Sequence, residues 1–257
     1  MRTRSLSLPV LISLLDSPVN CAVNQTLLSL PDLSIVIPAL NEAENLRLLL
    51  PLIREVTAEL NLEAEIIVVD GGSTDDTKQV AGDLGARAIE QVERGYGGAL
   101  LAGFASARAS HVVTMDADLS HPPVFLKDFW PERSSTDVLI ASRYIPGGKA
   151  DMALSRRILS TILNRTYAVL LDLQLRDLSS GFRMYDRRMI ESIDLQARDF
   201  DALEEILVRI HLRGGRIKEV PFHYQARQSG KSKAKLIRFG WGFSKTLLRM
   251  CRLRYLG

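Results

Sequence analysis

Short apolar segments alternate with helical stretches along the chain from Leu33 onward, and this alternation limits the fold more than any other feature. Between these segments, apolar residues recur every three or four positions, which is typical of helices. Strands separated by helices predict an α/β fold with a mostly parallel sheet covered on both faces. We expect strands over 34–37, 65–69, 86–89, 111–115 and 137–141.

The first helical stretch carries two local signals. Asn41, followed by Glu44 three residues later, predicts that a helix starts there. Pro51 falls inside the apolar repeat, so we expect a kink or a break at this residue. Further along, the pattern predicts helices over 98–109, 155–171 and 200–213, a strand or loop over 180–185, and a strand over 216–224.

Composition bounds the class of protein. No linker-like stretch interrupts the chain after Leu33, so we expect one domain over 33–235. Apolar residues make up 46% of the chain and charged residues 25%, which excludes a disordered or collagen-like protein. Cys21 and Cys251 alone cannot form a disulfide framework, which favours a reducing compartment. No charge-free apolar run reaches about 18 residues, so a bilayer-spanning helix is not expected.

The two ends of the chain differ from this domain. Residues 1–32 start with Arg2 and Arg4 before a short apolar stretch, which fits a weak secretory signal or a flexible extension, and we favour the extension. From Val220 to the C-terminus the chain has nine Lys or Arg and no Asp or Glu. Residues 236–257 predict a basic amphipathic helix, which either lies at a membrane surface or packs onto the domain.

Acidic residues follow several of the predicted strands. The carboxyl ends of parallel strands meet at one rim of a sheet, so we expect the loops 38–42, 70–76 and 116–118 to lie together there. Asp116 and Asp118 come directly after the fourth strand. Two carboxylates one residue apart can hold Mg²⁺ or Mn²⁺ against a diphosphate, although a solvated loop has the same pattern.

These loops match a known pattern. It consists of Ser34-Ile-Val-Ile-Pro-Ala-Leu-Asn41-Glu42, Glu65-Ile-Ile-Val-Val-Asp70-Gly-Gly-Ser73-Thr-Asp75-Asp76-Thr77 and Asp116-Ala-Asp118. With them, the chain resembles family 2 glycosyltransferases of the GT-A fold from about Leu33 to Lys235. A narrower resemblance, to dolichyl-phosphate mannose synthases and their bacterial polyprenyl-phosphate relatives, rests on Val113-Thr-Met-Asp-Ala-Asp-Leu-Ser-His-Pro-Pro123, Ala141-Ser-Arg-Tyr144, Gly181-Phe-Arg-Met-Tyr185 and Arg227-Gln-Ser-Gly-Lys-Ser-Lys233.

The resemblance implies an inverting, metal-dependent transfer of a hexose, first of all mannose from GDP-mannose, to a polyprenyl or dolichyl phosphate. It implies Mg²⁺ or Mn²⁺ as the cofactor, with Asp116 and Asp118 as ligands and Ser120 as a weaker ligand candidate. The implied catalytic residues are Asp118, Arg143 and Arg156, of which Arg156 would meet the acceptor phosphate. The implied donor-binding residues are Pro38, Leu40, Glu42, Val69, Asp70, Gly71, Asp116, Ala117, Asp118, Arg143, Arg227 and Lys233.

The acceptor decides which catalytic groups are needed. A phosphate is largely ionised at neutral pH and needs cations, which Arg143, Arg156 and Arg157 offer. A hydroxyl acceptor, used with a donor such as UDP-glucose, needs a general base instead. The base candidates are Asp201, Glu204 and Glu205. For Glu205 we favour a positioning role, because the resembling proteins also have an acid there.

Other features are less specific. A non-catalytic nucleotide-sugar-binding protein is the alternative of another class, and the presence of both Asp116 and Asp118 argues against it. The segment Arg94–Gly98 either brings backbone amides close to a phosphate or forms a plain helix-entry turn. His111 is expected to be structural, and His121 is a weak candidate for a metal ligand.

The expected partners are a nucleotide-sugar donor, a polyprenyl-phosphate acceptor and a membrane surface, with no nucleic acid. We expect a cytoplasmic protein bound peripherally to the cytosolic face of a membrane, directly or through an anchoring partner subunit.

Leu40 stands where the resembling proteins often have Tyr, and Gly71 where they often have an acid. These two differences leave the base and the sugar of the donor open.

Overall fold

A computed structural model describes residues 30–191, 193–225 and 236–256 of the chain. In this part, the main sheet has the strand order β3-β2-β1-β4-β7-β5-β8, and only β7 runs antiparallel to its neighbours β4 and β5. The predicted α/β fold with a mostly parallel sheet is confirmed. Its strands are β1 (Leu33–Ala39), β2 (Ala64–Asp70), β3 (Arg87–Glu90), β4 (His111–Thr114), β5 (Val138–Ser142), β7 (Arg183–Asp186) and β8 (Ile217–Pro221).

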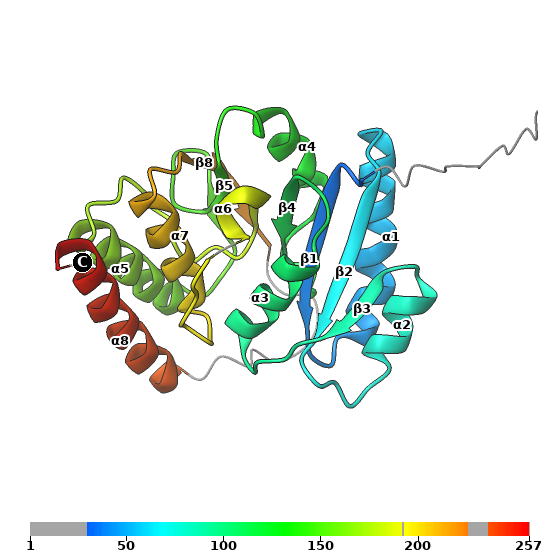
Figure 1. Ribbon diagram of the computed structural model, residues 1–257, viewed down its shortest axis with the longest axis horizontal. Coiled ribbons are helices and arrows are strands. Elements are labelled where there is room, and N and C mark those ends of the chain that lie inside the picture. Colours follow the sequence, from blue (N-terminus) through cyan, green and yellow to red (C-terminus); the bar gives the residue numbers. More distant parts are fainter. Residues whose placement is uncertain (1–29, 192, 226–235, 257) are drawn as a thin grey trace, which may run out of the picture.

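Helices cover both faces of this sheet (Figure 1). The long or well-packed ones are α1 (Ala43–Glu59), α2 (Thr77–Asp83), α3 (Tyr96–Ser106), α5 (Leu154–Leu170), α7 (Ala202–Leu212) and α8 (Leu236–Tyr255). The short elements are η1 (Pro123–Phe125), α4 (Leu126–Phe129), η2 (Trp130–Glu132), α6 (Arg187–Ile190) and the small parallel pair β6 (Lys149–Ala150) and β9 (His223–Tyr224). Helices α5, α7 and α8 gather at one end of the molecule, opposite α1 and α2 (Figure 1).

The alternation of side chains along β1 divides the core into two layers. Ile35 and Ile37 belong to the layer under α1, whereas Val36 belongs to the layer under α3 and α7. All three are fully buried. Burial of one such side chain contributes about 1.5–3 kcal/mol, so both layers hold the sheet in place.

The start of helix α1 differs from the sequence prediction. The helix begins at Ala43 and its N-cap residue is Glu42, without a side-chain cap. Asn41 instead has a φ of 54° and accepts a hydrogen bond from the backbone amide of Thr74 at 2.7 Å. The free amide of Ala43 donates to Asp75 Oδ2 at 3.2 Å. The predicted cap at Asn41 is therefore wrong, because a distant loop supplies the acceptor.

Helix α1 also continues through Pro51 without a break. Proline removes one helical hydrogen bond, which leaves a carbonyl one turn earlier without its donor. Pro51 lies on the exposed side of the helix, where water can bind that carbonyl, while Leu50 and Ile53 on the other side stay fully buried. The packing of α1 thus outweighs the lost bond.

Helix α8 packs onto the domain. Phe243, Thr246 and Met250 are buried, and the hydroxyl of Thr246 donates to Asp201 at 2.6 Å. The hydroxyl of Tyr167 in α5 donates to the carbonyl of Phe243 at 2.7 Å. One face of the predicted basic helix is therefore covered by protein, as the packing alternative expects.

The close approach of α3 to β1 predicts the effect of one substitution. A Cβ atom on Gly103 would lie 2.2 Å from Cγ1 of Val36, so Gly103→Ala forces α3 away from the sheet. We expect a loss of about 1–3 kcal/mol in the free energy of unfolding, measured by urea denaturation followed by circular dichroism. Gly82→Ala in α2, where nothing lies within 4 Å, is the control and should be neutral or stabilising. Equal effects of both substitutions would contradict this account.

Candidate functional site

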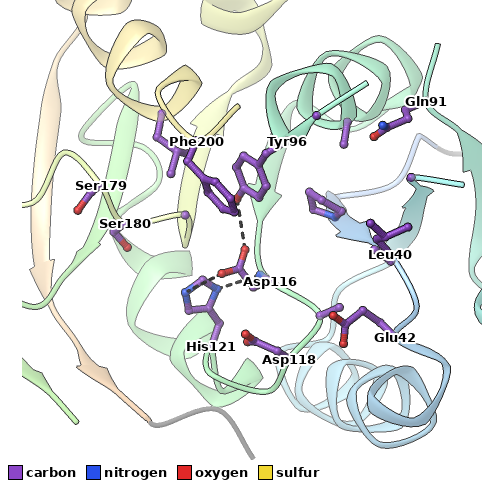
Figure 2. A pocket seen from close by; sticks show the side chains of 18 of the residues that line it. Leu40, Glu42, Gln91, Tyr96, Asp116, Asp118, His121, Ser179, Ser180 and Phe200 are labelled. Atoms are coloured by element: carbon purple, nitrogen blue, oxygen red, sulfur yellow. Dashed lines mark hydrogen bonds and ion pairs between the residues drawn. The ribbon is translucent and has the colours of Figure 1, made fainter. Parts of the chain in front are cut away.

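A cavity of 1390 Å³ opens at the carboxyl ends of β1, β2 and β4. The three loops that were predicted to meet at one rim all contribute to its wall. Figure 2 shows Leu40 and Glu42 of the first loop and Asp116 and Asp118 of the third. The predicted site residues that line the cavity are Pro38, Leu40, Glu42, Asp70, Gly71, Asp116, Ala117, Asp118, Arg143 and Arg156. The cavity is thus formed by segments that lie far apart in the sequence.

Hydrogen bonds between two of the loops fix this wall. The backbone amide of Glu42 donates to Thr77 Oγ1 at 2.9 Å, and that of Asn41 donates to Ser73 Oγ at 2.9 Å. Asp70 is 5% exposed, and its carboxylate accepts from the backbone amides of Gly72 and Ser73. Part of the hydrogen-bonding capacity of Asp70 therefore serves the shape of its own loop.

The carboxylates of Asp116 and Asp118 differ in their surroundings. Asp116 Oδ1 accepts a hydrogen bond from the hydroxyl of Tyr96 at 3.3 Å, and its side chain is 31% exposed. Asp118 is 3% exposed, and its Oδ1 accepts from the backbone amide and the hydroxyl of Ser120 at 3.1 and 2.5 Å. Both aspartates face the same cavity (Figure 2).

His121 orients the loop that carries these aspartates. Its Nδ1 accepts from the backbone amide of Asp116 at 2.9 Å, so the proton of the neutral ring lies on Nε2. Nε2 is 3.9 Å from Asp116 Oδ2, and the ring stacks on Phe182 at 5.0 Å. Burial lowers the pKa of His121, which keeps the ring neutral. These contacts suit a residue that positions Asp116.

Tyr96 is a site residue that sequence reasoning missed. Its ring stacks on Phe200 with centroids 4.7 Å apart, and its hydroxyl points to Asp116 (Figure 2). Burial and the nearby Asp116 carboxylate raise the pKa of Tyr96 well above its ordinary value, so it acts as a donor. The amide of Gly97, in the first turn of α3, donates to the carbonyl of Arg198 at 2.8 Å, so a distant segment takes up this amide. A tyrosine between glycines at a helix start was the available signal.

Arg143 lines the cavity but is held by an acidic partner. Its guanidinium makes hydrogen bonds to both carboxylate oxygens of Asp177, at 2.7 and 2.6 Å, and to Ser179 Oγ at 2.8 Å. The side chains of Arg143 and Asp177 are 11% and 0% exposed. Asp177 and Ser179 were not predicted, because they lie more than 30 residues away without a motif. This bidentate pair fixes the guanidinium plane and balances its charge.

The remaining predicted residues lie in different places. Arg156 is exposed on α5 and lines the cavity, whereas Arg157 does not line it. Val69 is fully buried in the core layer under α3, and Ser120 is fully buried behind Asp118; neither lines the cavity. Arg227, Lys231 and Lys233 lie outside the described residues.

The three acids of α7 have separate environments. Glu205 is buried, accepts from the amides of Gln196 and Ala197, and pairs with Arg209. Asp201 accepts from Thr246, as described above. Glu204 lines the cavity, is 1% exposed, and has no hydrogen-bond partner for either carboxyl oxygen among the described residues. Burial raises the pKa of Glu204 to about 8, so this carboxyl is mostly protonated at neutral pH.

Comparison with known proteins identifies the family. The family described as glycosyl transferase family 2 matches residues 34–194, which include all three loops of the rim. The chain is a member of glycosyl transferase family 2.

Two relatives in this family carry more specific names. A dolichol-phosphate mannosyltransferase of Pyrococcus furiosus is 34% identical over 211 residues, which cover 79% of this chain and 59% of that protein. A polyprenol monophosphomannose synthase of Mycolicibacterium smegmatis is 33% identical over 214 residues, which cover 77% of this chain and 79% of that protein. The predicted resemblance is confirmed, although the match spans less than two thirds of the Pyrococcus protein.

A solved structure shows the same fold. Glucosyl-3-phosphoglycerate synthase from Mycobacterium tuberculosis, crystallised with Mn²⁺, UDP-glucose and phosphoglyceric acid, matches with a TM-score of 0.68 and 23% identity. The match covers 86% of this chain and 80% of that chain. It confirms the GT-A fold predicted for this family 2 glycosyltransferase.

In the described residues, every helix is too short or too polar to cross a bilayer.

The donor set of the family 2 site fits a hard divalent cation. Asp116 and Asp118 supply carboxylate oxygens, the ligand type that Mg²⁺ and Mn²⁺ prefer. In the described part of the chain, no group of three or more His, Cys, Asp and Glu forms a metal cage. Mg²⁺ commonly takes only one or two carboxylates and completes its shell with water and substrate phosphates, so two aspartates suffice.

The buried Glu204 makes stability depend on pH. Between about pH 4.5 and 8 the unfolded chain loses the Glu204 proton while the folded protein keeps it, so this group destabilises the fold as pH rises. We expect Glu204→Gln to exceed the wild type in free energy of unfolding by a margin that grows to a few kcal/mol by pH 8. Urea denaturation at several pH values measures this margin. The exposed Glu55→Gln is the control, and a pH-independent margin for Glu204→Gln would refute the expectation.

Proposed function

We propose that the chain transfers a hexose from a nucleotide-diphosphate sugar to a polyprenyl phosphate, with mannose from GDP-mannose as the first donor to test. The observation that carries this proposal is one cavity lined by a carboxylate pair, Asp116 and Asp118, and by an exposed cation, Arg156. The names of the two relatives support the lipid-phosphate acceptor. In one displacement, an acceptor phosphate oxygen bonds to the anomeric carbon while the bond from that carbon to the diphosphate breaks.

The donor side of the proposed reaction rests on the rim loops. Asp116 and Asp118 would hold Mg²⁺ or Mn²⁺ against the diphosphate, and the bound ion would stabilise the charge that develops on the leaving group. Tyr96 and His121 fix the orientation of Asp116, and Ser120 fixes that of Asp118. Leu40, Glu42 and Gly71 line the part of the cavity proposed for the nucleoside.

The acceptor side needs positive charge rather than a base. A phosphate monoester is largely ionised at neutral pH, since its second pKa is about 6, and it is ready to attack. Arg156 is exposed at the cavity and is the proposed phosphate contact. Arg143 is proposed to orient the site through its fixed pair with Asp177.

A hydroxyl acceptor is the competing hypothesis, and Glu204 is its best base candidate because it lines the cavity. Its raised pKa disfavours this role, since a carboxyl protonated at neutral pH cannot take up a proton.

An acceptor panel separates the hypotheses. GDP-mannose, UDP-glucose and UDP-GlcNAc are each offered with a polyprenyl phosphate, a polyprenol or no acceptor, in the presence of Mg²⁺ or Mn²⁺. Transfer to the phosphate alone supports the proposal, and binding of donor without any transfer supports a non-catalytic protein.

Asp118→Asn should abolish metal-dependent transfer. The substitution keeps the size of the side chain but removes the charge that holds the ion, so we expect kcat/KM to fall by about 10²–10³-fold or more. Asp128→Asn, at an exposed position on α4, is the control and should leave transfer unchanged. Circular dichroism checks that both variants fold. Undiminished turnover by Asp118→Asn, or by wild type treated with a chelator, would refute the metal role.

Arg156→Ala should weaken the acceptor far more than the donor. Because the lost cation faces the lipid phosphate in this proposal, we expect the KM for a short-chain, detergent-soluble prenyl phosphate to rise about tenfold or more. The KM for the nucleotide sugar should change less than about twofold. Arg157→Ala removes the same charge one residue further along, outside the cavity lining, and is the matched control. Equal effects on both substrates would count against the acceptor role of Arg156.

A further inference from the structure

Helix α5 is an unusual element of this fold because so little of it is buried. Of its 17 residues, only Asn164 and Tyr167 are buried. An amphipathic helix on a sheet normally turns its apolar side to the core. In α5, Leu163 and Tyr167 pack on the core, but four other large apolar side chains lie in solvent: Leu154 is 70% exposed, Ile158 51%, Ile162 56% and Val169 70%.

These exposed residues form one stripe. A helix turns about 100° per residue, so Leu154, Ile158, Ile162 and Val169 fall within an arc of roughly 80°. Arg165, which is exposed, lies inside the same arc by this count. We call these five residues the α5 face. The side of α5 that lines the cavity, with Arg156, Ser160 and Leu163, is turned away from this stripe. One helix therefore has a cavity side and a separate apolar side.

Positive charge predominates on the helices that carry and adjoin the α5 face. Helix α5 contains no Asp or Glu, and among the described residues no acidic group pairs with Arg157 or Arg165. Helix α8 at the same end of the molecule adds exposed Lys245 and Arg252 and also lacks acids (Figure 1). An apolar stripe that includes Arg165, on a helix with Arg157 and no acidic residue, complements a surface that is both apolar and negative.

Apolar groups are also exposed where the ends of α5 and α8 meet. The hydroxyl of Tyr255 donates to the carbonyl of Leu170 at 3.0 Å, which joins the ends of the two helices. Leu170 is 45% exposed and Tyr255 61% exposed, and Leu256 next to it is 82% exposed. Exposed apolar groups therefore occur on both helices at this end of the molecule.

We propose that the α5 face docks onto the headgroup layer of an anionic lipid bilayer. A second copy of this chain would bring positive charge against positive charge, which disfavours self-association through this face. The proposal builds on the lipid acceptor of the proposed function, because a helix lying in the headgroup layer holds its cavity side at the depth of a lipid phosphate. Arg156 and Leu159 lie on α5 and line the cavity, so the docking element also forms part of the site wall.

The test uses the full chain and vesicles of phosphatidylcholine with or without phosphatidylglycerol, with binding measured by cosedimentation. The variant Leu154→Gln/Ile158→Gln/Ile162→Gln replaces three apolar residues of the α5 face by glutamine, which is polar and a good helix former. None of the three residues lines the cavity. We expect binding to anionic vesicles to weaken about tenfold or more. The control is Leu48→Gln/Leu52→Gln on α1, whose side chains are 56% and 43% exposed at the opposite end of the molecule (Figure 1).

Two further arms separate this inference from the proposed function. Arg157→Gln/Arg165→Gln should lower binding to anionic vesicles by about fivefold per charge and leave the weaker binding to neutral vesicles unchanged. Transfer to a short-chain prenyl phosphate in detergent should be the same in the stripe variant and the wild type. Failure of all transfer by the wild type would refute the proposed function without affecting the vesicle result.

Four results would overturn the docking proposal. The wild type does not bind anionic vesicles, or the α1 control loses as much binding as the stripe variant. Alternatively, analytical ultracentrifugation shows a wild-type dimer that the stripe variant dissociates, which would assign the α5 face to a second copy of the chain. Finally, a correctly folded stripe variant binds anionic vesicles as well as the wild type does, which would also overturn the proposal.

Discussion

The parallel alignment of β1, β2 and β4 is the constraint on which the site depends. Parallel neighbours end at the same rim, so the loops that follow Ala39, Asp70 and Thr114 meet although they lie far apart in the sequence. The loops then hold one another, because the acceptor for the first amide of α1 belongs to Asp75. The wall of the cavity therefore depends both on the topology of the sheet and on the hydrogen bonds between the loops.

The surroundings of the two aspartates follow from the cost of burying charge. A buried carboxylate needs hydrogen bonds, and here a tyrosine, a serine and a backbone amide are among the donors. These donors orient Asp116 and Asp118 at the wall of the cavity. Arg143 is instead held by a charged partner, the carboxylate of Asp177. The exposed Arg156 is thus the stronger candidate for binding an anion.

Local patterns in the sequence predicted the elements, and long-range contacts decided what the patterns left open. Strand and helix periodicity gave the parallel sheet and its rim, and the Asp116–Asp118 spacing gave the carboxylate pair. The helix-start signal at Asn41 was overridden by Asp75, and Arg143 was paired with Asp177, because a partner 30 or more residues away leaves no local trace. The expectation that Val69 binds the donor came from resemblance alone. In the structure, the side chain of Val69 points from its strand into the core.

Helix α5 shows the same limit in its amphipathic pattern. Periodicity predicts that one side of a helix is apolar, but it does not say whether protein or lipid covers that side. In α8 the buried Phe243 and Met250 show that protein covers the inner side, and in α5 the buried side carries Asn164 and Tyr167 instead. Tyr167, Leu163 and Ala168 pack α5 onto the core, yet its stripe of large apolar side chains lies on the outer side. Leaving such a stripe in water forgoes the free energy of its burial, and a lipid surface is the surrounding that would supply that burial.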